Sequence, residues 1–167
     1  MEAVLALSNG YLGVRSSFEE GLHNAESLRG TYMAGVFDTY PNATMVKLKG
    51  RPTHPSQMVN VPDFLPVQID LDGEALDLGV CTIEAYDRSL HMNRGVLSRD
   101  LTCTTPKGLR VQLSFLRFLS RPQPHVAAMR VSVTPLDRAC AVRFVSSING
   151  NVSNASTRHI VDAVATR

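Results

Sequence analysis

A regular alternation of apolar and polar residues around a tight-turn dipeptide is the feature that most constrains the fold. Apolar residues alternate with polar ones from Val67 to Leu71, Asp72-Gly73 follows, and the alternation resumes up to Leu78. A period of two is that of a β-strand, and Asp-Gly is a preferred two-residue hairpin turn. The segment is therefore predicted to be a β-hairpin.

Further β-type runs fill the second half of the chain. A second hairpin is predicted from Thr102 to Phe115, around the turn Pro106-Lys107-Gly108. Two more strands are predicted over Val126–Val133 and Ala141–Ile148, which are rich in β-branched residues and joined by a turn-like segment. Strands that follow one another through short turns indicate an all-β fold, an antiparallel β-sandwich.

The first half is less regular. Ser17–Gly35 is expected to be a loop with one helical turn at most, because Gly21 and Gly30 interrupt any apolar stripe. Four prolines between Arg51 and Pro66 predict an ordered, extended loop. Since no linker or repeat divides the chain, residues 1–167 are read as a single domain.

Composition excludes several kinds of partner. Seventeen Lys+Arg against 15 Asp+Glu give a net charge of +2, too small a field to recruit nucleic acid or an anionic membrane. The apolar stretches are far shorter than the roughly 20 residues of a membrane helix. No basic segment followed by an apolar core opens the chain, so the predicted location is the cytoplasm.

Cysteines and histidines give no support for a disulfide or a metal. Cys81, Cys103 and Cys140 are odd in number and widely spaced, which predicts reduced, partly buried thiols. The five histidines show no ligand spacing, and the acidic residues near Asp72 lack the calcium-loop pattern. The sequence therefore predicts no metal and no cofactor.

Residue patterns also reveal no catalytic centre. Glu19 and Glu20 are the nearest approach to paired carboxylates, but successive side chains point in different directions and cannot easily flank one glycosidic bond. A solvated or ion-paired role is predicted for them.

Five sequence blocks, in this order along the chain, resemble those of a known protein family. They are Asn9-Gly10-Tyr11-Leu12-Gly13-Val14-Arg15 with Phe18-Glu19-Glu20-Gly21, Gly30–Phe37, Val59–Pro66, Tyr86–Arg99 and Ser146–Gly150. Together they resemble the opening of a glycoside hydrolase family 65 protein, the family of maltose, trehalose and kojibiose phosphorylases and acid trehalases.

The resemblance implies a β-sandwich of the supersandwich, galactose mutarotase-like, type that precedes an (α/α)₆ catalytic barrel. In the family, a glutamic acid of the barrel protonates the glycosidic oxygen while inorganic phosphate, or water in the hydrolases, attacks the anomeric carbon with inversion. The α-glucoside disaccharide and, in a phosphorylase, the phosphate co-substrate would thus meet the barrel. This chain is expected to lack the barrel, to hold an incomplete sandwich and to be inactive alone.

The motif residues are expected to be structural: Asn9, Gly10, Gly13, Arg15, Glu20, Arg88, Gly95 and Arg99. Gly10 and Gly13 would permit a tight backbone path, and an Arg15–Glu20 pair would hold it against the sheet. Ser16 stands where family members commonly have a glycine. A serine rarely adopts a positive φ, so a positive φ is not expected at this turn.

Asn60 and Asp63 are the candidate substrate-pocket residues. Their proline-rich segment is long and rigid enough to reach from the sandwich toward the barrel and to shape the sugar pocket.

Two other functions stay open, and self-association is predicted. A stand-alone carbohydrate-binding or interaction module would favour exposed aromatic residues, whereas the chain has no Trp and 6% aromatic residues. A mutarotase-like enzyme would need a histidine and a carboxylate converging in one cleft. The unpaired strand edges of an incomplete sandwich predict a homodimer.

Overall fold

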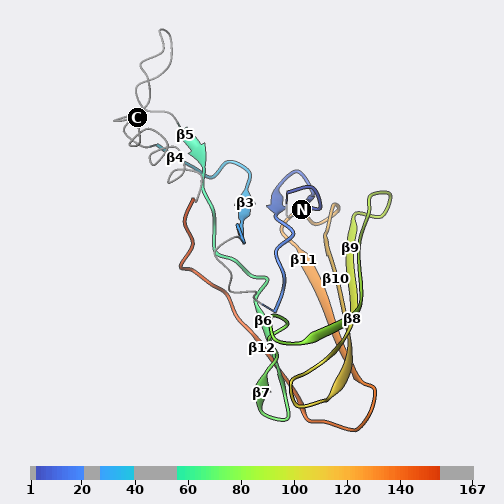
Figure 1. The fold of residues 1–167 in the computed structure, drawn as a ribbon. Helices are drawn as coiled ribbons and strands as arrows, with labels where there is room; N and C mark the ends of the chain where they lie inside the picture. The colour runs from blue at the N-terminus through green and yellow to red at the C-terminus, as the bar shows by residue number, and fades with distance from the viewer. Residues whose placement is uncertain (1–2, 21–26, 40–55, 155–167) are drawn as a thin grey trace, which may run out of the picture.

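The computed structural model describes residues 3–20, 27–39 and 56–154 (Figure 1). These residues form short and long β-strands joined by turns and contain no helix. Within these ranges, therefore, nothing has the length and apolar character of a helix that could cross a membrane. The predicted all-β, antiparallel class is confirmed.

The largest sheet has four long strands in the order β11-β10-β9-β8, and all neighbours are antiparallel. Their bounds are β8 Thr82–His91, β9 Val96–Thr104, β10 Arg110–Leu119 and β11 Ala127–Pro135. Strict alternation of buried and more exposed residues along β9 and β10 gives this sheet one inner and one outer face.

A smaller sheet covers the inner face. Its order is β12-β6-β7, with β6 Val67–Leu71, β7 Glu74–Ala75 and β12 Val142–Ser146. The turn between β6 and β7 has φ of 52° at Asp72 and 85° at Gly73. Both central residues are left-handed, as a type I′ hairpin turn requires, so the hairpin predicted from the Asp-Gly dipeptide is confirmed.

The hydrophobic core lies between these two sheets. Side chains of β6, β9 and β10, with one leucine just after β7 and one just before β10, pack in a single cluster. Its members are Val67, Ile69, Leu71, Leu76, Leu101, Cys103, Leu109, Val111, Leu113 and Phe115. Because each strand contributes every second residue, the period-two pattern of the sequence becomes the inner faces of a sandwich.

The N-terminal part forms two small sheets beside this sandwich (Figure 1). One has the order β1-β2-β3, with β1 Leu7–Ser8, β2 Leu12–Val14 and β3 Thr31–Met33, and the other pairs β4 Phe37–Thr39 with β5 Ser56–Met58. The predicted loop over Ser17–Gly35 has no helix in its described part, and its end is β3. Its residues 21–26, and residues 51–55 of the proline-rich segment, lie outside the described ranges.

Two features of the large sheet differ from the sequence expectations. The second hairpin is longer than predicted, because β9 begins at Val96 and β10 continues to Leu119. The strand β8 was not predicted, because its polar residues fall on both faces and blur the alternation.

The sandwich is open along its edges. Tyr86 lies opposite Leu101 and so shares the inner face, yet it is 50% exposed. Phe144 of β12 lies opposite the buried Ile69 and is 48% exposed. Apolar inner-face area is therefore uncovered at β8 and at β12.

All three cysteines are free thiols, as predicted. Cys103 is fully buried in the core, while Cys81 and Cys140 are half-buried and pack against it. Burial raises the pKa of the Cys103 thiol to about 12, with a further contribution from the neighbouring Cys81. Since a reactive cysteine needs its thiolate, Cys103 is chemically inert at neutral pH.

The core predicts a large effect of truncating Leu113, which is fully buried. Leu113→Ala is expected to lower the free energy of unfolding by about 2–5 kcal/mol, because it removes apolar contacts and leaves a cavity. Gln112→Ala on the exposed outer face is the control and should change it by less than about 0.5 kcal/mol. Urea unfolding measures both, and equal effects would contradict the assignment of the inner face.

Candidate functional site

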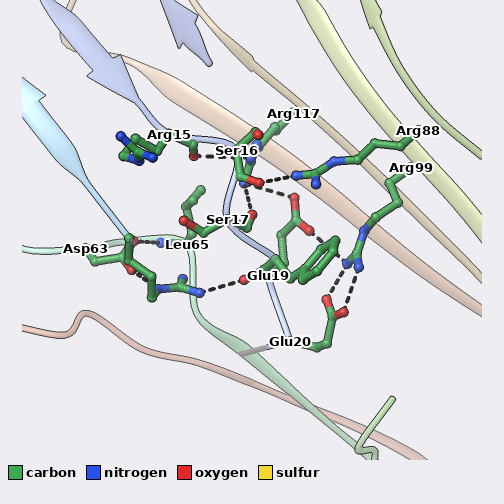
Figure 2. A network of polar contacts seen from close by, with 12 residues as sticks. Arg15, Ser16, Ser17, Glu19, Glu20, Asp63, Leu65, Arg88, Arg99 and Arg117 are labelled. Carbon is green, nitrogen blue, oxygen red and sulfur yellow. Dashed lines mark hydrogen bonds and ion pairs between the residues drawn. The ribbon is translucent and has the colours of Figure 1, made fainter. Parts of the chain in front are cut away.

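The irregular segment of residues 15–20, between β2 and the core, is the centre of the most buried polar region (Figure 2). Ser16 and Ser17 are 0% and 1% exposed, and Glu19 is 4% exposed. Because the segment is buried without strand partners along its length, its carbonyl groups need donors from side chains. Arginines from the large sheet supply donors to the carbonyls of Arg15, Ser16 and Ser17.

Arg99 of β9 holds both adjacent glutamates. Its Nη2 lies 2.9 Å from Glu19 Oε2, and its Nη1 donates to Glu20 Oε1 at 2.6 Å, with a second, short contact from Nη2 to Glu20 Oε2. The Glu20 contact is thus bidentate, the strongest geometry for a guanidinium and a carboxylate. Of the solvated or ion-paired roles predicted for the two glutamates, the structure shows the ion-paired one.

Two aromatic rings enclose the same guanidinium. The Cζ atom of Arg99 lies 4.0 Å from the ring centre of Phe115 and 4.5 Å from that of Phe18. Burial works to lower the pKa of Arg99, but the hydrogen bond and charge of Glu20 and the charge of Glu19 outweigh it, so the pKa is raised. Arg99 is therefore a permanently charged group inside the domain.

Arg117 of β10 and Arg88 of β8 complete the cluster. Arg117 donates to the carbonyls of Ser17 (3.1 Å) and Arg15 (3.4 Å), and its Nη1 lies 3.0 Å from Glu19 Oε1. Arg88, directly opposite Arg99 in the sheet, donates to the carbonyl of Ser16. The three arginines thus reach the segment from three neighbouring strands.

The cluster has more positive than negative charge. Three arginines face two glutamates, and further guanidinium donors are met by the carbonyls of Arg15, Ser16 and Ser17. The Nε atoms of all three arginines, Arg88, Arg99 and Arg117, are buried without a hydrogen-bond partner. Burial lowers the pKa of Arg117, the charge of Glu19 opposes this, and the like charges of Arg88 and Arg99 add to it. Removing one of the partners of such a buried charge is therefore expected to be strongly destabilising.

Glu20 does not pair with Arg15, contrary to the sequence expectation. The two residues lie at opposite sides of the network (Figure 2), and Glu20 instead meets Arg99, 79 residues away in the chain. Residues 15–18 continue beyond β2 without turning back, which carries Glu20 away from Arg15. Arg15 contributes its main chain, with its N–H donating to the Gly30 carbonyl at 2.9 Å.

Asp63 joins the proline-rich segment to the same region. Its Oδ2 lies 2.5 Å from Arg29 Nε, and its Oδ1 accepts the N–H of Leu65 at 3.0 Å. Arg29 also donates to the carbonyl of Phe18 at 2.7 Å. Arg29 therefore bridges the buried segment and Asp63, which is itself 2% exposed.

Asn60 lies farther out and ties three chain segments together. Its Oδ1 accepts the N–H of Thr31 at 2.8 Å, and its Nδ2 donates to the carbonyls of Arg29 (3.2 Å) and Ser153 (3.3 Å). It also lines a hollow of about 330 Å³ with Asp38, Gln57, Asn154 and neighbouring residues. The structure thus brings Asn60 to a polar hollow and Asp63 to a buried ion pair.

The remaining motif residues shape turns. Gly10 has a φ of +93° and Gly95 of +63°, so both need the freedom of glycine, whereas Gly13 lies within β2 without a positive φ. Ser16 is not among the described residues with positive φ, so this turn does not need the glycine common in the family. Asn9 accepts the N–H groups of Tyr11 and Leu12 and fixes the first turn.

Sequence reasoning missed Arg117 and Arg29, although one signal was available. Arg99 stands between Leu97 and Leu101, and Arg117 follows Phe115 by two residues, so both occupy inner-face positions of alternating strands. An arginine at such a position requires a buried partner. The partner could not be named, because it lies about 80 or 100 residues away.

Known proteins are similar to this chain in sequence. The family model "Glycosyl hydrolase family 65, N-terminal domain" matches residues 1–167. A kojibiose phosphorylase of Halothermothrix orenii is 32% identical over 161 residues, 96% of this chain and 19% of that protein. An alpha,alpha-trehalose phosphorylase of Thermoanaerobacter brockii is 33% identical (92% and 20%), and a maltose phosphorylase of Bacillus subtilis 31% (95% and 21%).

A solved structure agrees with the sequence matches. A protein named as a kojibiose phosphorylase, from the human microbiome, superposes with a TM-score of 0.70 at 25% identity, covering 80% of this chain and 18% of that one. The chain belongs to glycosyl hydrolase family 65 and corresponds to the N-terminal domain of that family. It spans about a fifth of the length of the curated relatives it matches.

The network predicts that Arg99 is among the most sensitive positions of the domain. Arg99→Met is expected to lower the free energy of unfolding by about 3–5 kcal/mol, because it leaves two buried carboxylates without their main partner. The matched control is Arg130→Met on the exposed outer face, with an expected change below about 0.5 kcal/mol. Urea unfolding followed by circular dichroism decides, and a value for Arg99→Met near that of the control would contradict the network's role.

Proposed function

We propose that this chain is the scaffold domain of a cytoplasmic enzyme that cleaves α-linked glucose disaccharides by inverting phosphorolysis, a transfer of the glucosyl group to inorganic phosphate. The alternative is inverting hydrolysis, in which water rather than phosphate accepts the glucosyl group. The proposal rests on the relatives, which are named as phosphorylases of kojibiose, trehalose and maltose.

One structural observation carries the scaffold role. The family-motif residues Glu20, Arg88 and Arg99 meet inside the domain in a network whose carboxylates are already engaged. The Glu19 and Glu20 side chains are 4% and 3% exposed, so neither can protonate a bound sugar. We assign the general acid to the (α/α)₆ barrel.

The uncovered inner-face residues support contact with further protein. Tyr86, Ile83 and Phe144 are each more than two-fifths exposed, although they lie opposite buried residues of the neighbouring strands, namely Leu101, Cys103 and Ile69. Exposed apolar area of this kind is stabilised when another element covers it. The barrel and adjoining segments of a longer protein are the proposed partners.

Disaccharide cleavage tests the proposed function. Maltose, trehalose and kojibiose are offered, with and without phosphate, to this chain and to the longest product of its native gene. We expect activity in the longer product alone, dependent on phosphate. Cleavage by the 167-residue chain would overturn the scaffold assignment, and phosphate-independent cleavage by the longer product would favour hydrolysis.

A stand-alone carbohydrate-binding module is the second candidate. The hollow beside Asn60, about 330 Å³ in volume, presents amide and carboxylate side chains, which suit sugar hydroxyls. This alternative would be favoured if the short chain bound one of the disaccharides without cleaving it.

Within the proposed enzyme, Asn60 and Asp63 shape the sugar pocket indirectly. Asp63 fixes the proline-rich segment through Arg29, and Asn60 positions its exposed part at the polar hollow. Neither residue is placed at the reacting bond.

In the longer product, Asn60→Ala and Asp63→Ala are expected to weaken apparent disaccharide affinity about tenfold, which corresponds to about 1.4 kcal/mol. Turnover should fall much less, because positioning affects binding more than bond cleavage. Gln112→Ala is the control, and steady-state kinetics with circular dichroism at the assay temperature provide the measurement. Unchanged affinity and turnover in both variants would remove the two residues from the pocket.

Self-association follows from the open sheet edge. The strand β8 is ten residues long, lies at the edge of its sheet and carries the exposed Ile83 and Tyr86. Such an edge pairs readily with a second copy. We expect light scattering of the 167-residue chain to show a homodimer whose population rises with concentration, and a monomer over the whole range would contradict this.

A further inference from the structure

Three chain segments enclose a hollow that the proposed function does not use. The first strand, the turn between β8 and β9 and the loop after β10 surround about 480 Å³, more than the hollow beside Asn60. Two arginines, Arg94 and Arg121, line it together with Ser8, Asn9, Asn93 and Ser120. Phe118 and Met92 add apolar surface.

The charge of this hollow is uncompensated. Neither the Arg94 nor the Arg121 guanidinium has a hydrogen-bond or ion-pair partner among the described residues. The residues that line the hollow include no carboxylate. By contrast, Arg110 and Arg138, at the opposite end of the same sheet, are each paired with an acidic side chain. Two exposed positive charges thus share one concave surface without an anion from the described residues.

Hydrogen bonds hold the walls in place. Asn9 Nδ2 donates to the carbonyls of Ser120 (2.7 Å) and Pro124 (3.0 Å), which joins the first strand to the loop after β10. That loop is closed by Gln123 N–H donating to Ser120 Oγ, and the β8–β9 turn by Arg94 N–H donating to the His91 carbonyl at 3.0 Å. The backbone walls of the hollow are therefore held in place before a ligand binds, which lowers the entropic cost of binding, and only the arginine side chains have to be ordered.

We propose that this hollow binds a small sugar phosphate, with Arg94 and Arg121 on the phosphate group. Guanidinium groups offer several donors in a planar fork that matches phosphate oxygens. The amide and hydroxyl side chains of Asn93, Ser8 and Ser120 suit the hydroxyl groups of the sugar, and the volume lies within the range of small-molecule pockets. The site is separate from the Arg99 network and stands whether or not the proposed function holds.

Isothermal titration calorimetry tests the site with glucose 1-phosphate, inorganic phosphate and uncharged glucose. The proteins are this chain and the longest product of its native gene. We expect one site on the short chain that binds glucose 1-phosphate more tightly than phosphate and does not bind glucose. Binding should weaken as salt rises, because the hollow is open to solvent. On the longer product, one binding equivalent beyond the catalytic site is expected.

Substitutions assign the site to its residues. Arg94→Gln and Arg121→Gln should each weaken glucose 1-phosphate binding about tenfold, about 1.4 kcal/mol, and the double variant should lose the site. Arg130→Gln on the outer face is the control, and circular dichroism confirms folding. The double variant of the longer product should retain turnover. Absence of glucose 1-phosphate binding by the wild-type chain, or unchanged binding by the double variant, overturns the assignment.

Discussion

The structure depends on one guanidinium group held between two phenyl rings and two carboxylates. Arg99 reaches inward from β9, contacts Phe18 and Phe115 with its faces, and donates from its edge to Glu19 and Glu20. A charge removed from water is costly unless its partners are fixed around it. The carboxylates, in turn, fix a chain segment that has no regular structure of its own.

This arrangement explains how an irregular segment can lie buried against the large sheet. The carbonyls of residues 15–18 are satisfied mainly by arginine side chains from β8, β10 and the bridging Arg29. Arg29 extends the connection to Asp63 and so to the proline-rich segment. A continuous set of polar contacts thus runs from the large sheet to the part of the domain proposed to shape the sugar pocket.

Local features of the fold were predictable from the sequence, because local chemistry determines them. The Asp72-Gly73 dipeptide itself favours the positive φ angles of its turn, and the alternation of apolar and polar residues around Leu113 indicates the inner face of β10. The Arg99–Glu20 pair was not predictable, since its members are 79 residues apart and the nearer Arg15 offered a plausible partner. The edge strand β8 was missed because it is exposed on both faces and carries little pattern.

Family membership and the buried network are the two observations behind the proposed supporting role of the domain. The chain matches the N-terminal domain of family 65, and the motif residues Glu20, Arg88 and Arg99 that helped reveal that match are engaged inside the protein. We propose that the motif residues stabilise the fold of the domain. Selectivity for a sugar would then arise at the contact between this domain and the rest of an enzyme. The open strand edges and the arginine-lined hollow are the surfaces that we propose for other partners.

A double-mutant cycle between Arg99 and Glu20 tests the central claim most directly. Urea unfolding of the wild type, Arg99→Met, Glu20→Gln and the double variant gives the coupling free energy of the pair. The account predicts a coupling of about 2 kcal/mol or more, toward the upper end of the range for residues in one buried network. Effects that add to within about 0.5 kcal/mol would mean that the pair is independent, and would contradict the view that this interaction holds the domain together.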